Sequence, residues 1–200
     1  MPVFFRTISK RNMVAFVLAV LCAGCGNQFA RHYVASPDQF EPIAVIAIAP
    51  FENLTDFPNA GEVVADIVGA ELIALGRYKV IERETTVRLG AEAQLPWPPL
   101  LDRSFAAELG RKIQADALVI GSINEFNYRL DKSRQAPREP AVAVSVRMVN
   151  VRSGAVIWAT TMSMSSYDMF STERDPVNRI AQKIASQMAR RLVAGIGGHQ

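Results

Sequence analysis

The apolar residues of this chain recur with two periods, which predict strands in some segments and helices in others. Residues 43–49 (IAVIAIA) are apolar throughout, a pattern typical of a strand that is buried on both faces. Residues 78–81 and 117–123 are predicted as further strands. Between residues 142 and 160, apolar residues alternate with small or polar ones on either side of an Arg-Ser-Gly turn, which predicts a β-hairpin.

A spacing of three and four residues between apolar positions predicts the helices. The first begins after Asn59, which has a glutamate three residues further on as in a capping box, and it ends at Gly76. A weaker helical pattern covers residues 85–94. Clear patterns cover residues 103–113 and a last helix that has Asp175 as its N-cap and Pro176 as its first residue and that ends at the last glycines.

This order of elements predicts an α/β fold in which helices pack on a mixed sheet. The strand–helix–strand units in the first half require crossovers and parallel strands, whereas the later hairpin adds antiparallel strands. Two segments show neither period. Residues 26–41 are predicted to form a 16-residue tether, and the charged, proline-containing residues 131–140 are predicted to form a loop.

The first 24 residues have the layout of a bacterial lipoprotein signal peptide. A basic start precedes an apolar run at residues 13–21, and small residues then lead into Cys25. The arrangement resembles a lipobox, in which cleavage precedes a cysteine that receives a lipid, although Cys22 stands where leucine is usual. Gly26 follows Cys25 in place of the aspartate that retains lipoproteins at the inner membrane, so the resemblance implies the outer membrane.

Other interpretations of the leader fit less well. From residue 13 to residue 24 it has 12 residues, whereas a transmembrane helix needs about 20. Cys22 and Cys25 have the C-x-x-C spacing of a redox pair, but they end an apolar leader and do not start a helix of a folded domain. An uncleaved signal anchor is the remaining alternative.

Three segments are therefore expected. Residues 1–24 form the signal peptide, residues 25–41 comprise the lipidated Cys25 and a short tether, and residues 42–200 form a single periplasmic α/β domain. A tether of this length spans about 22 Å on average, which keeps the domain near the membrane.

Removing the leader changes the charge balance. The whole chain carries 22 Lys and Arg against 19 Asp and Glu, and the three leader cations account for the difference. A neutral mature chain lacks the positive field that nucleic-acid binding requires, so we expect no nucleic-acid partner. With Cys22 removed and Cys25 lipidated, no disulfide is expected.

Few residues indicate catalysis. The two histidines, His32 and His199, lie in the expected tether and beside the last residue, whereas a general base must be held rigidly near its substrate. The sequence contains neither a histidine–cysteine cluster for zinc nor a glycine-rich phosphate loop after a strand. We therefore expect no enzymatic activity, no cofactor and no metal.

Two groups of residues are candidates for binding. Glu52, Asn53 and Asp56 follow the first strand, where α/β proteins often bind ligands, and could form a ligand or interface loop; the alternative is solvated acids beside a helix cap. The second group is apolar and is predicted to lie in loops, where it would contact a membrane or a partner or else fold back over the core edge. It consists of Trp97, Tyr167, Met169 and Phe170.

Four segments together resemble the curli-secretion lipoprotein (CsgG) superfamily. They lie in the order of that family and are residues 43–55, 80–83, 115–122 and 149–154, the last followed by Trp158. The resemblance implies an anticodon-binding-domain-like α/β fold, an outer-membrane lipid anchor and no enzymatic activity. Ring-shaped oligomers occur in the family, so a homo-oligomer is expected.

One departure separates this chain from the secretion channel of that family, which crosses the membrane with two hairpins. Each spanning strand needs about 9–11 residues, and residues 131–140 and 165–174 offer ten each. We therefore expect a small periplasmic member without the pore-forming hairpins.

Two functions remain open from the sequence. The first is a scaffold or accessory protein of an envelope secretion or export assembly. The alternative is a regulator that binds and activates a peptidoglycan synthase, a role in which an outer-membrane protein must reach an enzyme of the inner membrane. The short tether favours the first.

Overall fold

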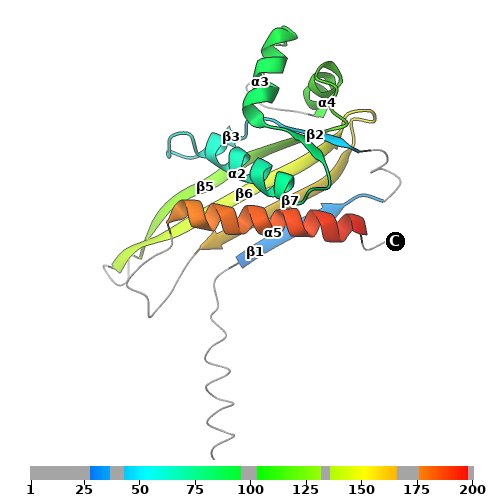
Figure 1. Cartoon of the computed structure of the whole chain (residues 1–200). Coiled ribbons are helices and arrows are strands. Elements are labelled where there is room, and N and C mark those ends of the chain that lie inside the picture. The colour runs from blue at the N-terminus through cyan, green and yellow to red at the C-terminus, as the bar shows by residue number, and fades with distance from the viewer. Residues whose placement is uncertain (1–27, 37–42, 96–102, 132–135, 166–175, 198–200) are drawn as a thin grey trace, which may run out of the picture.

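The computed structural model describes residues 28–36, 43–95, 103–131, 136–165 and 176–197 (Figure 1). Within these residues, seven strands form one sheet in the order β1-β7-β6-β5-β2-β4, and β3 pairs with β5 beside this path. The strands are β1 (Gln28–Val34), β2 (Val45–Ile48), β3 (Glu52–Asn53), β4 (Lys79–Ile81), β5 (Ala117–Asp131), β6 (Ala136–Asn150) and β7 (Val156–Ser165).

The sheet is mixed, as the sequence predicts. β2 runs parallel to β4 and β5, and β3 runs parallel to β5. The pairs β5–β6, β6–β7 and β1–β7 are antiparallel. Parallel pairing thus occupies the half of the sheet built from the early strand–helix–strand units, and the hairpin strands occupy the other half.

Helices pack on both faces of the sheet (Figure 1). α2 (Ala60–Ala74) and α5 (Val177–Gly197) cover one face, and α3 (Arg83–Glu92) and α4 (Arg103–Lys112) cover part of the other. Ile46 and Ile48 of β2 belong to the core beneath α2 and α5, while Ala47 belongs to the core beneath α4. The prediction that this strand is buried on both faces is confirmed.

The predicted tether is wrong for residues 28–34, which form the edge strand β1. Every residue from Gln28 to Val34 has a register partner on β7, from Met164 to Trp158. The strand escapes the periodicity analysis because one of its faces is not covered by a helix, and Phe29 and Tyr33 on that face are 51% and 53% exposed. His32 accordingly lies on a strand of the sheet.

The predicted loop over residues 131–140 is also wrong. β5 continues to Asp131 and β6 starts at Ala136, so only residues 132–135 separate the two strands. β7 pairs with β6 no further than Ala141. Beyond that residue, the end of the β5–β6 hairpin, which we call the arm, is held by backbone pairing between β5 and β6. Such pairing does not require alternating apolar residues, so the sequence pattern does not reveal it.

The helix after Asn59 forms without the predicted capping box. Asn59 has the left-handed φ of 60° and its side chain makes no cap hydrogen bond. Its carbonyl oxygen instead accepts a hydrogen bond from the backbone N–H of Val63 at 3.0 Å. Gly76, with a φ of 64°, ends the helix as predicted.

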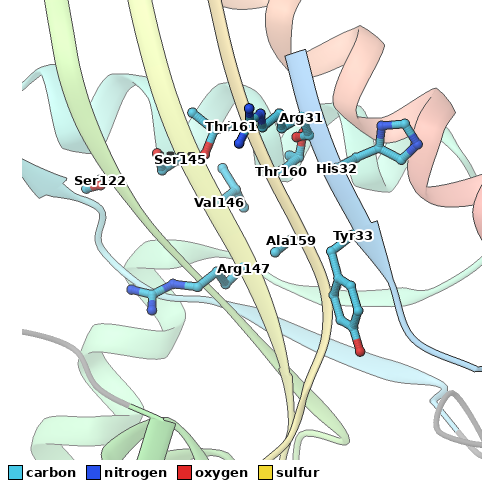
Figure 2. A pocket seen from close by; sticks show the side chains of 10 residues that line it. All are labelled: Arg31, His32, Tyr33, Ser122, Ser145, Val146, Arg147, Ala159, Thr160 and Thr161. Atoms are coloured by element: carbon cyan, nitrogen blue, oxygen red, sulfur yellow. Dashed lines mark hydrogen bonds between the residues drawn. The ribbon is translucent and has the colours of Figure 1, made fainter.

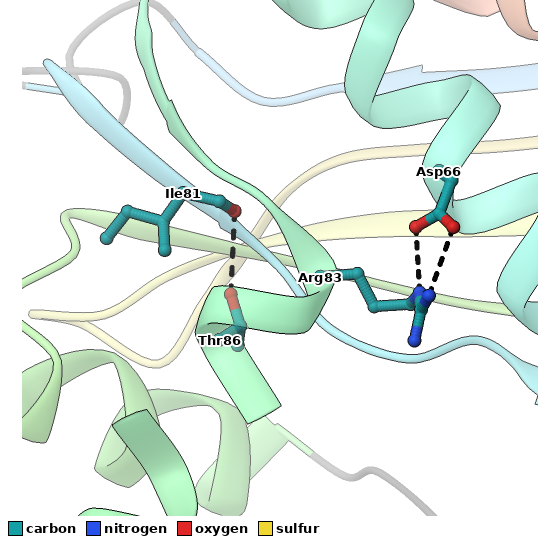
Figure 3. A network of polar contacts seen from close by, with 4 residues as sticks. All are labelled: Asp66, Ile81, Arg83 and Thr86. Atoms are coloured by element: carbon teal, nitrogen blue, oxygen red, sulfur yellow. Dashed lines mark hydrogen bonds and ion pairs between the residues drawn. The ribbon is translucent and has the colours of Figure 1, made fainter. Parts of the chain in front are cut away.

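α3 is fastened to α2 by an ion pair (Figure 3). The Arg83 guanidinium donates to both carboxylate oxygens of Asp66, from Nε to Oδ1 at 2.7 Å and from Nη2 to Oδ2 at 3.0 Å. The hydrogen bond to Asp66 raises the pKa of Arg83 above its ordinary value. Thr86 of α3, which is fully buried, donates from Oγ1 to the carbonyl oxygen of Ile81 at 3.4 Å. The side chains of Asp66, Arg83 and Thr86 are thus engaged in contacts that stabilise the fold.

Two glycines of α2 provide a test of how closely this helix packs. A Cβ atom at Gly61 would overlap the carbonyl oxygen of Phe51, whereas at Gly69 its nearest neighbour would be Ile48 Cγ1 at 3.7 Å. We expect Gly61→Ala to lower the free energy of unfolding by about 1–3 kcal/mol through overpacking. Gly69→Ala, the matched control, should raise it by up to about 1 kcal/mol through helix propensity. Urea unfolding of both variants measures the two free energies, and equal effects would contradict the close approach of the Phe51 carbonyl oxygen to Gly61.

The contribution of β1 to stability is a second prediction. Thr160 Oγ1 donates to the carbonyl oxygen of Arg31 at 3.0 Å, and the Ala35 N–H donates to the carbonyl oxygen of Ile157 at 2.8 Å. A chain that begins at residue 37 should lose at least about 1 kcal/mol relative to one that begins at Gly26, from these bonds alone. The melting temperature should fall by at least about 2–4 °C. Identical melting temperatures would show that residues 28–36 are a tether after all.

Candidate functional site

The predicted loop at the end of β2 is organised around Asn53. Glu52 and Asn53 form β3 and pair with Ser122 and Ile123 of β5. Asn53 Oδ1 accepts hydrogen bonds from the backbone N–H of Thr55 at 3.1 Å and from Thr55 Oγ1 at 2.8 Å. Its Nδ2 donates to the carbonyl oxygen of Phe57 at 2.8 Å. The Asn53 amide therefore fixes the loop conformation.

This loop presents apolar side chains to solvent. Leu54 is 58% exposed and Phe57 is 44% exposed. The Phe57 ring rests on that of Phe126, with centroids 4.9 Å apart, and a shallow cavity of about 420 Å³ lies between residues 54–58 and 124–127. Asp56 lines the cavity and is exposed. Among the described residues, no three His, Cys, Asp or Glu side chains gather in a way that would hold a metal ion.

A second surface lies on the face of the sheet that α3 and α4 cover only in part. Here β1, β7 and β6 expose a shallow cavity of about 440 Å³ (Figure 2). We call this surface the open face and define it by six residues. They are Arg31, Tyr33, Ser145, Arg147, Ala159 and Thr161.

Strand register orders the open face into rows. One row crosses four strands in direct register and consists of Arg31, Thr161, Ser145 and Ser122. The hydroxyl oxygens of Ser145 and Thr161 in this row lie 3.1 Å apart and share a hydrogen bond. The next row consists of Tyr33, Ala159, Arg147 and Ile120. Ile120 belongs to the core beneath α4, so this helix layer bounds the open face on one side.

The open face combines two cations with hydroxyls and exposed rings. Arg31, Arg147 and Tyr33 are exposed, and Ser145 and Thr161 are half-buried. The Arg31 guanidinium carbon lies 5.7 Å from the centroid of the Phe29 ring, within cation–π distance. Figure 2 shows His32 pointing to the other side of the sheet from Arg31 and Tyr33, as the alternation along β1 requires.

The open face was not predicted because residues 26–41 show neither a strand nor a helix period. Phe29 and Tyr33 do stand at alternate positions, but Arg31 between them interrupts the apolar pattern of a strand. Arg147 alternates with apolar residues of the predicted hairpin, and its sequence context does not mark it as a binding residue. Cys25, Trp97, Tyr167, Met169 and Phe170 lie outside the described residues, so their roles stay predictions.

Residues 43–173 match the sequence family described as the curli production assembly/transport component CsgG. The chain belongs to the CsgG family. The resemblance noted in the sequence is thereby confirmed. β1 precedes the matched residues and α5 follows them, yet both pack into the same fold as the CsgG-family segment. No curated protein matches the chain in sequence.

Solved structures share the fold at low sequence identity. The PelC dodecamer from Paraburkholderia phytofirmans is 19% identical, covers 86% of this chain and 99% of its own, and has a TM-score of 0.54. Lipoprotein GNA1162 from Neisseria meningitidis is 14% identical, covers 75% of this chain and 98% of its own, and has a TM-score of 0.51. These likenesses confirm the α/β fold. In the part of the chain that the structure describes, no helix combines the length and the apolar character needed to cross a bilayer.

The Asn53 hydrogen bonds give a testable consequence for the loop. Asn53→Ala removes all three, and we expect faster amide exchange at residues 54–57 and a loss of about 1 kcal/mol of stability, because the bonds are exposed. Asn53→Asp keeps the two acceptor contacts and loses only the donor to Phe57, so its effect should be smaller. Hydrogen exchange followed by mass spectrometry measures both, and an equal effect of the two variants would contradict this account.

Proposed function

We propose that this CsgG-family protein is an outer-membrane lipoprotein on the periplasmic side, anchored through Cys25, and a non-enzymatic, oligomeric component of an envelope secretion or export assembly. The observation that carries the proposal is the position of β1. Only Gly26 and Asn27 lie between Cys25 and the first residue of β1. The Cα atoms of Cys25 and Gln28 are therefore at most about 11 Å apart, whatever the conformation between them.

A domain on so short a connection stays at the membrane surface. The 16-residue tether expected from the sequence allowed the fold to move a few nanometres away, but β1 uses seven of those residues in the sheet. A regulator of a synthase in the inner membrane would have to cross the periplasm. The position of β1 favours a role beside the outer membrane.

Two further findings support the assembly part of the proposal. The family is described as an assembly and transport component. PelC, which shares the fold, forms a dodecamer. Head-to-tail contacts between identical subunits generate closed rings when the rotation between subunits closes, so a ring is the expected form of oligomer.

The two leader cysteines provide a matched test of the anchor. Cells that express the full chain are fed a palmitate analogue that can be labelled, and membrane and soluble fractions are separated. We expect labelled protein in the outer membrane for the wild type and for Cys22→Ser, and loss of both label and membrane association for Cys25→Ser. Labelled protein from the Cys25→Ser variant would refute the anchor.

Light scattering on the lipidated chain in detergent tests the oligomer separately. A mass of several subunits is expected. A single-subunit mass at the highest soluble concentration would refute the ring while leaving the anchor unaffected.

A further inference from the structure

The open face carries two cations whose charge is not neutralised by an ion pair among the described residues. Within the described residues, the ion pairs involve other residues, and neither Arg31 nor Arg147 has a carboxylate partner. Two carboxylates lie on this face by strand register: Glu52 of β3, which pairs with Ser122 in the row of Arg31, and Glu125 of β5, one row further along. An exposed arginine in water needs no partner, but two arginines that line one cavity favour an anionic occupant.

The spacing of the two arginines suits one occupant that spans both. Arg31 and Arg147 stand on strands separated by β7 and in adjacent rows. Strand geometry puts their Cα atoms about 12 Å apart, and both side chains belong to the same cavity lining.

The floor between the arginines carries two hydroxyl groups and lacks large exposed apolar side chains. It consists of Ser145, Thr161 and Ala159. An acidic peptide would find no pockets there for its apolar side chains, and a lipid would find no apolar groove. Hydroxyl groups can both donate and accept hydrogen bonds, so this floor matches a ligand that is itself rich in hydroxyl groups.

Tyr33 adds an aromatic ring to the open face. Its ring is 53% exposed at the rim of the cavity and is therefore available for contact with a flat, weakly polar ring face. An exposed aromatic ring, a hydroxyl floor and two guanidinium groups together complement a pyranose ring that carries a carboxylate.

We propose that the open face binds an acidic saccharide, a chain of sugar residues with carboxylate groups such as uronic acids. Arg31 and Arg147 hold the carboxylates through charge-assisted hydrogen bonds, Ser145 and Thr161 bind ring hydroxyls, and Tyr33 packs against a sugar ring. The site lies within the folded domain, so it can be tested independently of the lipid anchor and of a role in export.

Calorimetric titration of the full lipidated chain in detergent tests the proposal. The ligand is a trimer of galacturonic acid, and the matched control ligand is the same trimer with its carboxyl groups methyl-esterified. We expect the acid to bind at least about tenfold more tightly than the ester, because the ester removes the charge and keeps the shape.

Arginine variants locate the binding. Arg31→Gln and Arg147→Gln should each weaken binding of the acid by about tenfold and leave the weak binding of the ester unchanged. Arg190→Gln is the matched control, because Arg190 is exposed on α5 on the opposite side of the sheet. Tyr33→Ala should weaken acid and ester alike. Circular dichroism melts of all four variants verify that they fold.

Several outcomes would overturn the proposal. Equal affinity for acid and ester would remove the role of the arginines, and an equal effect of Arg190→Gln would show nonspecific attraction. Equally tight binding of polyglutamate or inorganic phosphate would show a simple anion site. Absence of binding at millimolar trimer, together with a changed oligomer mass in Arg31→Gln or Arg147→Gln, would identify the open face as a contact between subunits.

Discussion

The antiparallel pairing of β1 with β7 is the constraint on which the other conclusions depend. It extends the sheet by one strand, and a hydrogen bond from the Thr160 hydroxyl to the Arg31 carbonyl oxygen stabilises the pairing. Because β1 starts at Gln28, the same pairing determines how far the domain can stand from Cys25. Because β1 carries Arg31 and Tyr33, it also provides two of the six residues of the open face. The distance of the domain from Cys25 and the chemistry of the open face are therefore two results of one strand pairing.

The sequence predicted the parts of the fold that are held together by apolar burial. β2, the β6–β7 hairpin and α2 were recognised because their buried residues follow the period of their secondary structure, as Ile46 and Ile48 do beneath the helices. It did not predict β1 or the arm of the β5–β6 hairpin. β1 has a helix layer on only one of its faces, where Ala30 and Val34 pack against the core, and the end of the β5–β6 hairpin beyond Ala141 is held by pairing between two strands. Backbone pairing leaves little trace in composition.

The candidate site shows the same division. Glu52, Asn53 and Asp56 were chosen for their place after the first strand, and the structure puts Glu52 and Asn53 on the short strand β3 and Asp56 in the loop that follows it. The role of Asn53 as the hydrogen-bonding centre of that loop could not be predicted from the sequence, because it depends on contacts with Thr55 and Phe57. Arg31 and Arg147 are 116 residues apart in the chain and become neighbours only through β7. Sequence spacing alone could not join them.

Amide hydrogen exchange along residues 28–34 of the full chain tests the central claim most directly. An edge strand in an antiparallel pair directs alternate N–H groups toward its partner and the others toward solvent. The account predicts slow and fast exchange at alternate residues of β1, measured residue by residue by nuclear magnetic resonance. Uniformly fast exchange across residues 28–34 would contradict it, because that is the behaviour of a tether.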